Sequence, residues 1–165
     1  FDMTGQFEDT AVEGIKPYEN LTNCTFASYG TYLLAKETTS DKEMQDALDM
    51  IRFSEDQFVC WDYLPNQHGV RIYFAPCVLE QYKYRTPIDY SACNMAEAWL
   101  YLYKHTGNEL HLSKAKAMID NITIMQNIST GMLPTLWCFR GGTDWINCSH
   151  RSIDMLLQMD KLLKE

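Results

Sequence analysis

"LLAKETTSDKEMQDALDMIRFSEDQF" (residues 33–58) and "YLYKHTGNELHLSKAKAMIDNITIMQ" (residues 101–126) are two copies of one pattern. A shift of 68 positions aligns identical residues in the two stretches: Leu34 with Leu102, Lys36 with Lys104, Thr38 with Thr106, Ala47 with Ala115, Met50 with Met118, and Ile51 with Ile119. Each copy has an apolar stretch, a short polar link, and a stretch whose apolar residues recur at helical spacing. The sequence therefore predicts a helical hairpin that occurs twice.

The two helices of each hairpin differ in their apolar pattern. The second helix carries apolar residues on one face only: Met44, Ala47, Leu48, Ile51 and Phe58 in the first copy, and Leu112, Ala115, Ile119 and Ile122 in the second. The first helices, TFASYGTYLL (25–34) and MAEAWLYLY (95–103), are apolar nearly all round, as is typical of helices covered on both sides. SIDMLLQMDKLL (152–163) is a third segment of this kind. We therefore expect five long helices, inner and outer in alternation, with essentially no extended sheet.

The connections at the two ends of the hairpins differ in length. Inner helices lead to outer ones through short links, ETTSD (37–41) and HTGNE (105–109), and Gly107 is placed to end a helix. Outer helices return to inner ones through long segments, about 62–90 and 127–147, whereas such connections usually take roughly 2 to 8 residues. GVRIYF (69–74) and GMLPTLW (131–137) within them favour short β-structure. Because long loops tend to be functional, we expect the functional residues at this end of the molecule.

The composition excludes several classes of protein. The chain has 165 residues and a net charge of −8 without a basic block, so we expect no nucleic-acid partner. No window approaches the roughly 18 apolar residues of a membrane span, so we expect no membrane partner either. The six cysteines form no CxxC pair and the four histidines lack zinc-finger spacing, so we expect no metal and no cofactor. Cys24, Cys93 and Cys148, near the starts of apolar helices, are expected to pack as small buried thiols.

Several stretches together resemble one known superfamily: MIRFSEDQFVCW (50–61), PCVLEQY (76–82), PIDYSA (87–92), YLYKHTGNELHLSKAKAM (101–118) and TGMLPTLW (130–137). They are similar to the six-hairpin glycosidases, and in particular to proteins of carbohydrate-degrading gut bacteria. The resemblance implies an all-α fold over residues 1–165, a partial α/α toroid of about two and a half helical hairpins with long loops on one rim. A complete toroid has six hairpins, so the chain resembles the C-terminal portion of one, as a single domain or a fragment. Periplasmic or secreted localisation is favoured by the same resemblance.

Three carboxylates in or beside the long loops are candidates for catalysis. Glycoside hydrolases use one carboxylic acid to protonate the leaving oxygen and one carboxylate to activate water or attack the anomeric carbon. We expect Glu80 and Asp144 to form this acid–base pair. Asp89 is expected to be a substrate-orienting carboxylate or the alternative base.

Each of these carboxylates also has a structural interpretation. Glu80 lies among apolar residues in VLEQY, where burial would raise its pKa and suit it to general-acid work, but an ion pair with Arg85 is equally credible. Asp89 directly precedes an apolar helix and could be its N-cap. Asp144 follows two glycines and could be a turn aspartate.

Aromatic and polar residues of the same loops are candidates for binding a sugar. We expect PCVLEQYKYRTPIDYSA (76–92), held in shape by its prolines, to form one wall of a saccharide cleft. The expected substrate-binding residues are Trp61, His68, Arg71, Tyr82, Tyr84, Arg85, Trp137 and Trp145. The tryptophans could equally belong to the core or its edge. Glu55 and Asp56 are expected on a solvated outer face, so we leave them out.

The expected function is that of a carbohydrate-active protein, a glycoside hydrolase acting through paired carboxylates on an oligosaccharide or polysaccharide fragment. The alternative is a non-catalytic helical-repeat module that binds a glycan or a protein. An epimerase of similar fold would use histidines as proton shuttles, and only His68 and His150 are placed near the loops, so this function ranks lower.

A half-toroid leaves the flanks of its first and last inner helices without neighbours. The residues concerned are Phe26, Tyr29, Leu156 and Leu163. Because large exposed apolar patches mark interaction surfaces, we expect self-association or dependence on a missing N-terminal half.

Overall fold

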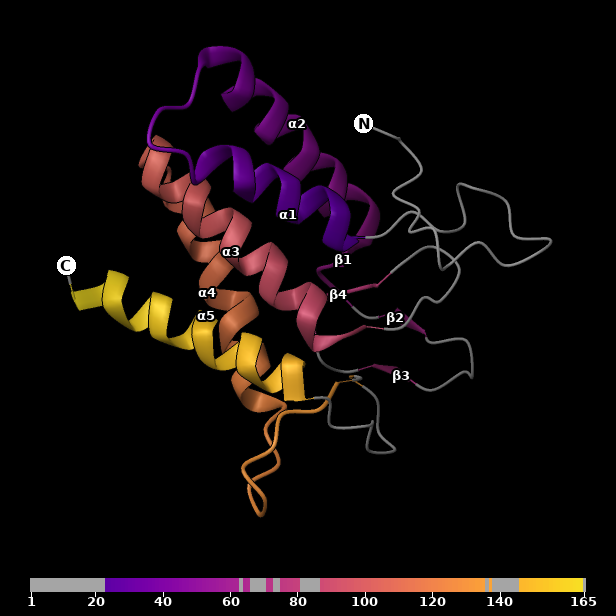
Figure 1. The fold of residues 1–165 in the computed structure, drawn as a ribbon. Coiled ribbons are helices and arrows are strands. Elements are labelled where there is room, and N and C mark those ends of the chain that lie inside the picture. The colour runs from indigo at the N-terminus through magenta and orange to yellow at the C-terminus, as the bar shows by residue number, and fades with distance from the viewer. Residues whose placement is uncertain are drawn as a thin grey trace.

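Five helices make up most of the described protein (Figure 1). The structure, a computed structural model, describes residues 23–62, 64–65, 71–72, 75–80, 87–135, 137 and 146–164. The helices are α1 (Asn23–Leu34), α2 (Asp41–Phe58), α3 (Asp89–Thr106), α4 (Glu109–Ile124) and α5 (Ile146–Lys164). The strands are two residues long: β1 (Val59–Cys60), β2 (Leu64–Pro65), β3 (Arg71–Ile72) and β4 (Cys77–Val78). Within the described ranges, five long helices without an extended sheet are confirmed.

The strands form two small antiparallel pairs. In β1 and β4, Val59 lies opposite Val78 and Cys60 opposite Cys77. In the second pair, β2 lies beside β3. The strand expected in GVRIYF is therefore confirmed by β3. GMLPTLW holds no named strand among its described residues, 131–135 and 137, although Asp89 N–H bonds to the carbonyl oxygen of Thr135 and Trp137 N–H to that of Pro87, which is an antiparallel pattern.

Three helices run in one direction and two return. Figure 1 shows that α1, α3 and α5 begin on the side of the strands and run away from it, whereas α2 and α4 run back. Helix α3 is central, since α1, α2, α4 and α5 all pack against it. Among the described helices, none is long and apolar enough to cross a bilayer.

We expected α1, α3 and α5 to be covered on both sides. This is confirmed for α3 but only in part for α1 and α5. Tyr29 and Tyr32 of α1 are exposed, as are Ile153 and Leu157 of α5. The flank predicted from the sequence is therefore half right: Tyr29 and Leu163 are exposed, but Phe26 and Leu156 pack against the core. The ring of Phe26 lies 4.6 Å from that of Phe53 on α2, which covers it.

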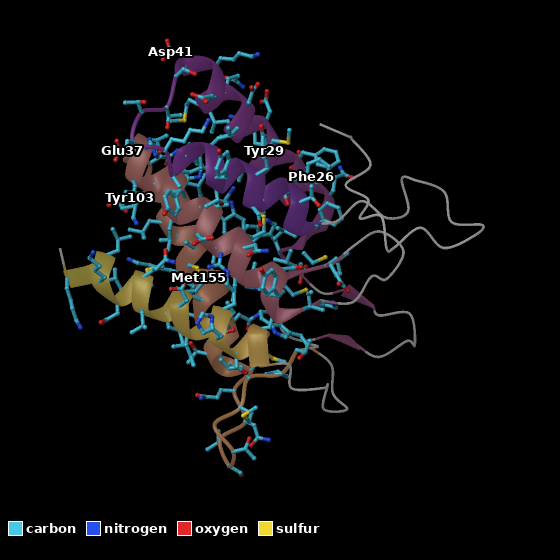
Figure 2. The ribbon with its side chains drawn as sticks, viewed as in Figure 1. Phe26, Tyr29, Glu37, Asp41, Tyr103 and Met155 are labelled. Atoms are coloured by element: carbon cyan, nitrogen blue, oxygen red, sulfur yellow. The ribbon has the colours of Figure 1, made fainter. Side chains whose placement is uncertain are left out.

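Equivalent signals start α2 and α4. Ser40 caps α2 by accepting a hydrogen bond from the backbone N–H of Glu43, and Asn108 caps α4 by accepting one from Leu110. These caps are 68 positions apart, the period of the repeat. Gly107 ends α3 in the left-handed conformation (φ 65), as predicted. Exposed charged residues such as Glu37 and Asp41 gather at this link end, away from the strands (Figure 2).

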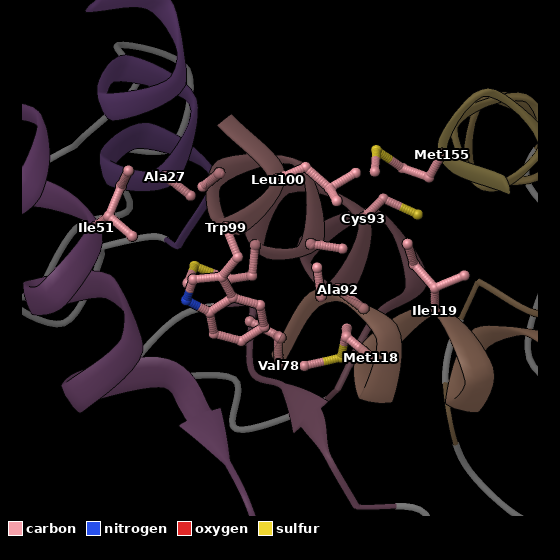
Figure 3. Close-up of a cluster of buried hydrophobic side chains, with 14 of the residues drawn as sticks. Ala27, Ile51, Val78, Ala92, Cys93, Trp99, Leu100, Met118, Ile119 and Met155 are labelled. Atoms are coloured by element: carbon pink, nitrogen blue, oxygen red, sulfur yellow. The ribbon is translucent and has the colours of Figure 1, made fainter. Parts of the chain in front are cut away.

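The core is built around α3. Figure 3 shows Trp99 and Leu100 of α3 between Ile51 of α2 and Met155 of α5, and all four side chains are fully buried. Cys93 is also buried, as expected for a small thiol near a helix start. The side chains of Cys24 and Cys148 lie outside the described residues.

Helices α1 and α2 approach each other at a glycine. A Cβ added to Gly30 would lie 2.7 Å from Cγ1 of Ile51 and 3.2 Å from the carbonyl oxygen of Ala47. Both neighbours belong to the buried face of α2. The position 68 residues later is Ala98, so the first hairpin needs the smaller residue where the second takes alanine.

We expect Gly30→Ala to lower the free energy of unfolding by roughly 1–3 kcal/mol, because the added methyl overpacks the contact with Ile51. Urea unfolding measures the change. The double variant Gly30→Ala/Ile51→Ala should lose less unfolding free energy than the two single variants lose together, since the shortened side chain at position 51 removes the clash. Helix propensity alone would make Gly30→Ala stabilising by about 1 kcal/mol, and that result would contradict the close contact.

Candidate functional site

Four stretches of backbone are hydrogen-bonded side by side where α3 begins. They come from the end of α2, from β4 and the residue after it, from the start of α3, and from the loop before α5. The bonds are Leu79 N–H to Phe58 O (2.8 Å), Ile88 N–H to Val78 O (3.2 Å), Asp89 N–H to Thr135 O (3.0 Å) and Trp137 N–H to Pro87 O (3.0 Å). This ladder of hydrogen bonds joins both long connections and fixes the backbone at Asp89 and beside Glu80.

Asp89 lies fully buried at the centre of a polar cluster. Its Oδ1 accepts a hydrogen bond from the indole Nε1 of Trp137 at 3.2 Å, and its Oδ2 accepts one from the hydroxyl of Ser152. The Sγ of Cys93 lies 4.0 Å from Oδ2 and 3.5 Å from the Ser152 hydroxyl. The carboxylate thus joins α3, α5 and the loop between α4 and α5.

Burial dominates the ionisation of Asp89. Removal from water raises its pKa from the ordinary 3.8 to about 6, although the hydrogen bonds from Ser152 and Trp137 act in the opposite direction. The carboxyl group therefore exchanges its proton near pH 6.

The interpretation of Asp89 as an N-cap is wrong. Asp89 is the first residue of α3, and the cap position is held by Ile88, which makes no side-chain capping bond. The carboxylate is bonded instead to Trp137 and Ser152, which are distant in the sequence. Its negative charge still lies at the favourable, positive end of the helix dipole.

Glu80 lies half-buried just after β4. Burial raises its pKa, as the apolar setting of VLEQY predicts. The residue before Glu80, Leu79, faces Pro87 across an isolated antiparallel bridge, and Asp89 follows two residues later as the first residue of α3. Arg85, the alternative ion-pair partner of Glu80, lies outside the described residues.

The two described tryptophans of the predicted site lie in different surroundings. Trp137 is fully buried, so its ring has no face open to a ligand. Trp61 is 44% exposed, and its ring lies 5.4 Å from that of Trp99 at an angle of 31°. Of these two described tryptophans, Trp61 is the one with an exposed ring that a sugar could stack on.

A carboxylate that was not expected in the site, Glu55, bonds to Trp99, the ring neighbour of Trp61. Glu55 accepts hydrogen bonds from the indole of Trp99 at 3.2 Å and from Lys114 at 2.6 Å. Lys114 in turn lies 5.9 Å from the centre of the Trp61 ring. The expectation of a solvated Glu55 is therefore wrong, because its side chain is only 18% exposed, while its neighbour Asp56 is exposed as expected.

The remaining predicted site residues are not placed. Arg71 is described only as part of β3, without its side chain. The others lie outside the described residues: Asp144, His68, Tyr82, Tyr84, Arg85 and Trp145.

Sequence reasoning missed a polar seam between α3 and α5. Arg151 of α5 forms an ion pair with Glu97 of α3 and donates to Oδ1 of Asn94 at 3.3 Å. Gln158 also donates to Glu97, at 3.2 Å. The signal was the polar pair Asn94 and Glu97 within the otherwise apolar helix SACNMAEAWL (91–100).

A scan of the chain against protein-family models and a search of curated proteins found no match. At the end of the molecule where the long loops meet, the loop-bearing end, the described residues include a half-buried acid, Glu80, and an exposed aromatic ring, Trp61. Asp89 holds the start of α3 to α5 and to the loop before α5 there.

We expect the stability contributed by Asp89 to fall as the pH rises from about 4 to about 6. The folded protein holds the Asp89 proton more tightly than the unfolded chain, so the contribution is fully present only below the unfolded pKa. Relative to Asp89→Asn, the wild-type free energy of unfolding should drop by up to about 3 kcal/mol over this range.

Urea unfolding of both proteins at about pH 4, 5, 6 and 7 measures this difference. The exposed Asp46→Asn is the matched control, and its curve should run parallel to that of the wild type. Parallel curves for Asp89→Asn as well would show that Asp89 does not titrate as its burial requires.

Proposed function

We propose that this chain is a carbohydrate-active protein of the α/α-toroid type and that its loop-bearing end binds and hydrolyses an oligosaccharide or polysaccharide fragment. The observation that carries the proposal is Glu80, a half-buried carboxyl group with a raised pKa at the end where both long connections return. A carboxyl group that keeps its proton closer to neutral pH is suited to protonate a leaving oxygen.

The helix arrangement supports the toroid. Inner helices of a toroid run parallel and outer helices return between them, so all long loops meet at one rim. Helices α1, α3 and α5 run in one direction here, and α2 and α4 run back (Figure 1). The equivalent caps at Ser40 and Asn108 repeat the same unit.

In the proposed reaction Glu80 is the general acid and Asp144, on the second long connection, is the carboxylate that activates water or attacks the anomeric carbon. Asp89 has a different task, because its oxygens already accept hydrogen bonds inside the protein. We assign it as a positioning residue that ties the second connection and α5 to the start of α3. Trp61 is the proposed stacking surface for a sugar ring.

One observation favours the second candidate, a non-catalytic module that binds a glycan. Asp89 and Trp137, both proposed from the sequence for the site, are fully buried and bonded to each other. If Asp144 served only as a turn aspartate, Trp61 would remain as a binding surface without an acid–base pair. Hydrolysis and binding must therefore be measured separately.

We expect Glu80→Gln to lower the rate of glycan hydrolysis roughly a hundredfold or more while leaving binding nearly unchanged. We expect Trp61→Ala to weaken binding about tenfold, a loss of about 1.4 kcal/mol. Reducing-end release and affinity electrophoresis, with the same panel of plant and microbial polysaccharides, measure the two effects.

Glu37→Gln is the matched control, because Glu37 is exposed at the opposite end of the bundle (Figure 2). Unchanged turnover in Glu80→Gln would remove Glu80 from the catalytic role. Binding without any hydrolysis by the wild type would support the non-catalytic module.

We also propose that the exposed apolar face of α5 pairs with a second copy of the chain. Ile153 and Leu157, one helical turn apart, are more than half exposed, and Leu163 lies further along the same helix. Contiguous exposed apolar patches mark interaction surfaces.

Sedimentation velocity over a range of concentrations should show a dimer whose share rises with concentration. Ile153→Lys/Leu157→Lys should shift the chain to monomer without unfolding it, since neither side chain belongs to the core. A matched pair of changes on exposed polar positions of α2, Gln45→Lys/Asp49→Lys, should leave the dimer intact. A wild type that stays monomeric at the highest concentration would contradict this proposal.

A further inference from the structure

Two cysteines face each other in the strand pair β1–β4, within the long connection between α2 and α3. Cys60 of β1 lies directly opposite Cys77 of β4. Both are present as thiols. Cys77 is fully buried, whereas Cys60 is half-buried and can be reached from solvent.

The register of the strands suits a bond between the two sulfurs. Phe58 and Leu79, two positions further along the pair, share a backbone hydrogen bond of 2.8 Å. Hydrogen-bonded pairs recur at every second position of an antiparallel ladder, so Cys60 and Cys77 form one too, with Cα atoms about 5.5 Å apart. Disulfides join Cα atoms roughly 4.4–6.8 Å apart, with the commonest values near 5.5–6 Å.

The side chains are also on the same face of the ladder, as opposed residues of an antiparallel pair must be. A hydrogen bond with Cys60, together with burial, raises the pKa of the Cys77 thiol. The two sulfurs are therefore neighbours, and Cys77 keeps its proton while Cys60 stays a thiol.

We propose that Cys60 and Cys77 are a site of thiol–disulfide exchange at which a low-molecular-weight disulfide, such as oxidised glutathione, closes a cross-strand disulfide. The accessible Cys60 attacks first as its thiolate: a bond forms to one sulfur of the reagent, and the other sulfur leaves as a thiolate. The hydrogen bond that held the proton on Cys77 is then lost.

The second exchange closes the bridge. Cys77 gives its proton to the departed thiolate and attacks the sulfur of Cys60, and the second glutathione leaves as a thiolate that takes up a proton from water. Two protein thiols and one disulfide thus become one protein disulfide and two small thiols, with two electrons passing to the reagent. The oxidised chain carries a covalent link across strands only two residues long.

This site is independent of the proposed hydrolase activity, but it lies between two of its parts. Trp61 directly follows Cys60, and Glu80 is three residues beyond Cys77. A disulfide would fix the strand pair that holds both ends of this loop. The loop residues between the two cysteines would then be closed into a ring, which restricts the unfolded chain.

Peptide mapping after incubation with oxidised glutathione tests the proposal on the full chain. Trypsin cuts after Arg52, Arg71 and Lys83, so Cys60 and Cys77 lie in separate peptides, 53–71 and 72–83, each with a single cysteine. We expect these two peptides to be joined after alkylation of the remaining thiols, and the link to disappear with dithiothreitol. The oxidised chain should melt roughly 5–10 °C higher than the reduced one.

Variants separate the bridge from simple glutathione addition. Cys77→Ser should leave Cys60 carrying one glutathione and should remove the rise in melting temperature, whereas Cys24→Ser should behave as the wild type. A wild type that gains only a mixed disulfide at Cys60, or that joins either peptide to another cysteine, would overturn the assignment. So would two strand cysteines that remain unmodified.

Discussion

The buried carboxylate of Asp89 constrains the rest of the structure. A carboxyl group without access to water is costly unless its oxygens are hydrogen-bonded, and here the indole of Trp137 and the hydroxyl of Ser152 supply those bonds. Asp89 and these two partners come from three separate parts of the chain. The bonds can form only if α5 and the loop before it meet the start of α3 in one arrangement, so the cost of burying Asp89 selects the arrangement of the whole loop-bearing end.

The polar seam between α3 and α5 extends this constraint along the helices. Arg151, which directly precedes Ser152 of the Asp89 cluster, pairs with Glu97 and Asn94, and Gln158 donates to Glu97 from further along α5. Apolar contacts such as that of Met155 with the core tolerate small shifts, whereas paired charges and directional hydrogen bonds do not. The interface of α3 with α5 is therefore set in register by polar groups as well as by packing.

The repeat, the caps and the burial of Glu80 follow from local sequence and were predictable. Apolar spacing identifies hairpins, Gly107 marks the end of α3, and a glutamate surrounded by apolar residues is expected to be half-buried. Long-range partners were not predictable. Ser152 is 63 residues from Asp89, and Lys114 is 59 residues from Glu55, so no periodic pattern links them. An N-cap was one interpretation of Asp89 because an aspartate just before an apolar helix commonly caps it. In the structure its carboxylate instead accepts a hydrogen bond from the distant indole of Trp137.

The difference between the two ends of the bundle gives the fold an asymmetric tolerance to evolutionary change. At one end the links are short and α2 and α4 each begin with their own capping side chain, so an insertion there would displace both helices of a hairpin. At the other end each doubling of a loop's length costs only about 0.6 kcal/mol of closure entropy. New recognition surfaces can therefore be added, lengthened or exchanged on the loop side while the helical scaffold keeps its spacing, which makes this end the natural place for related sequences to diverge in specificity.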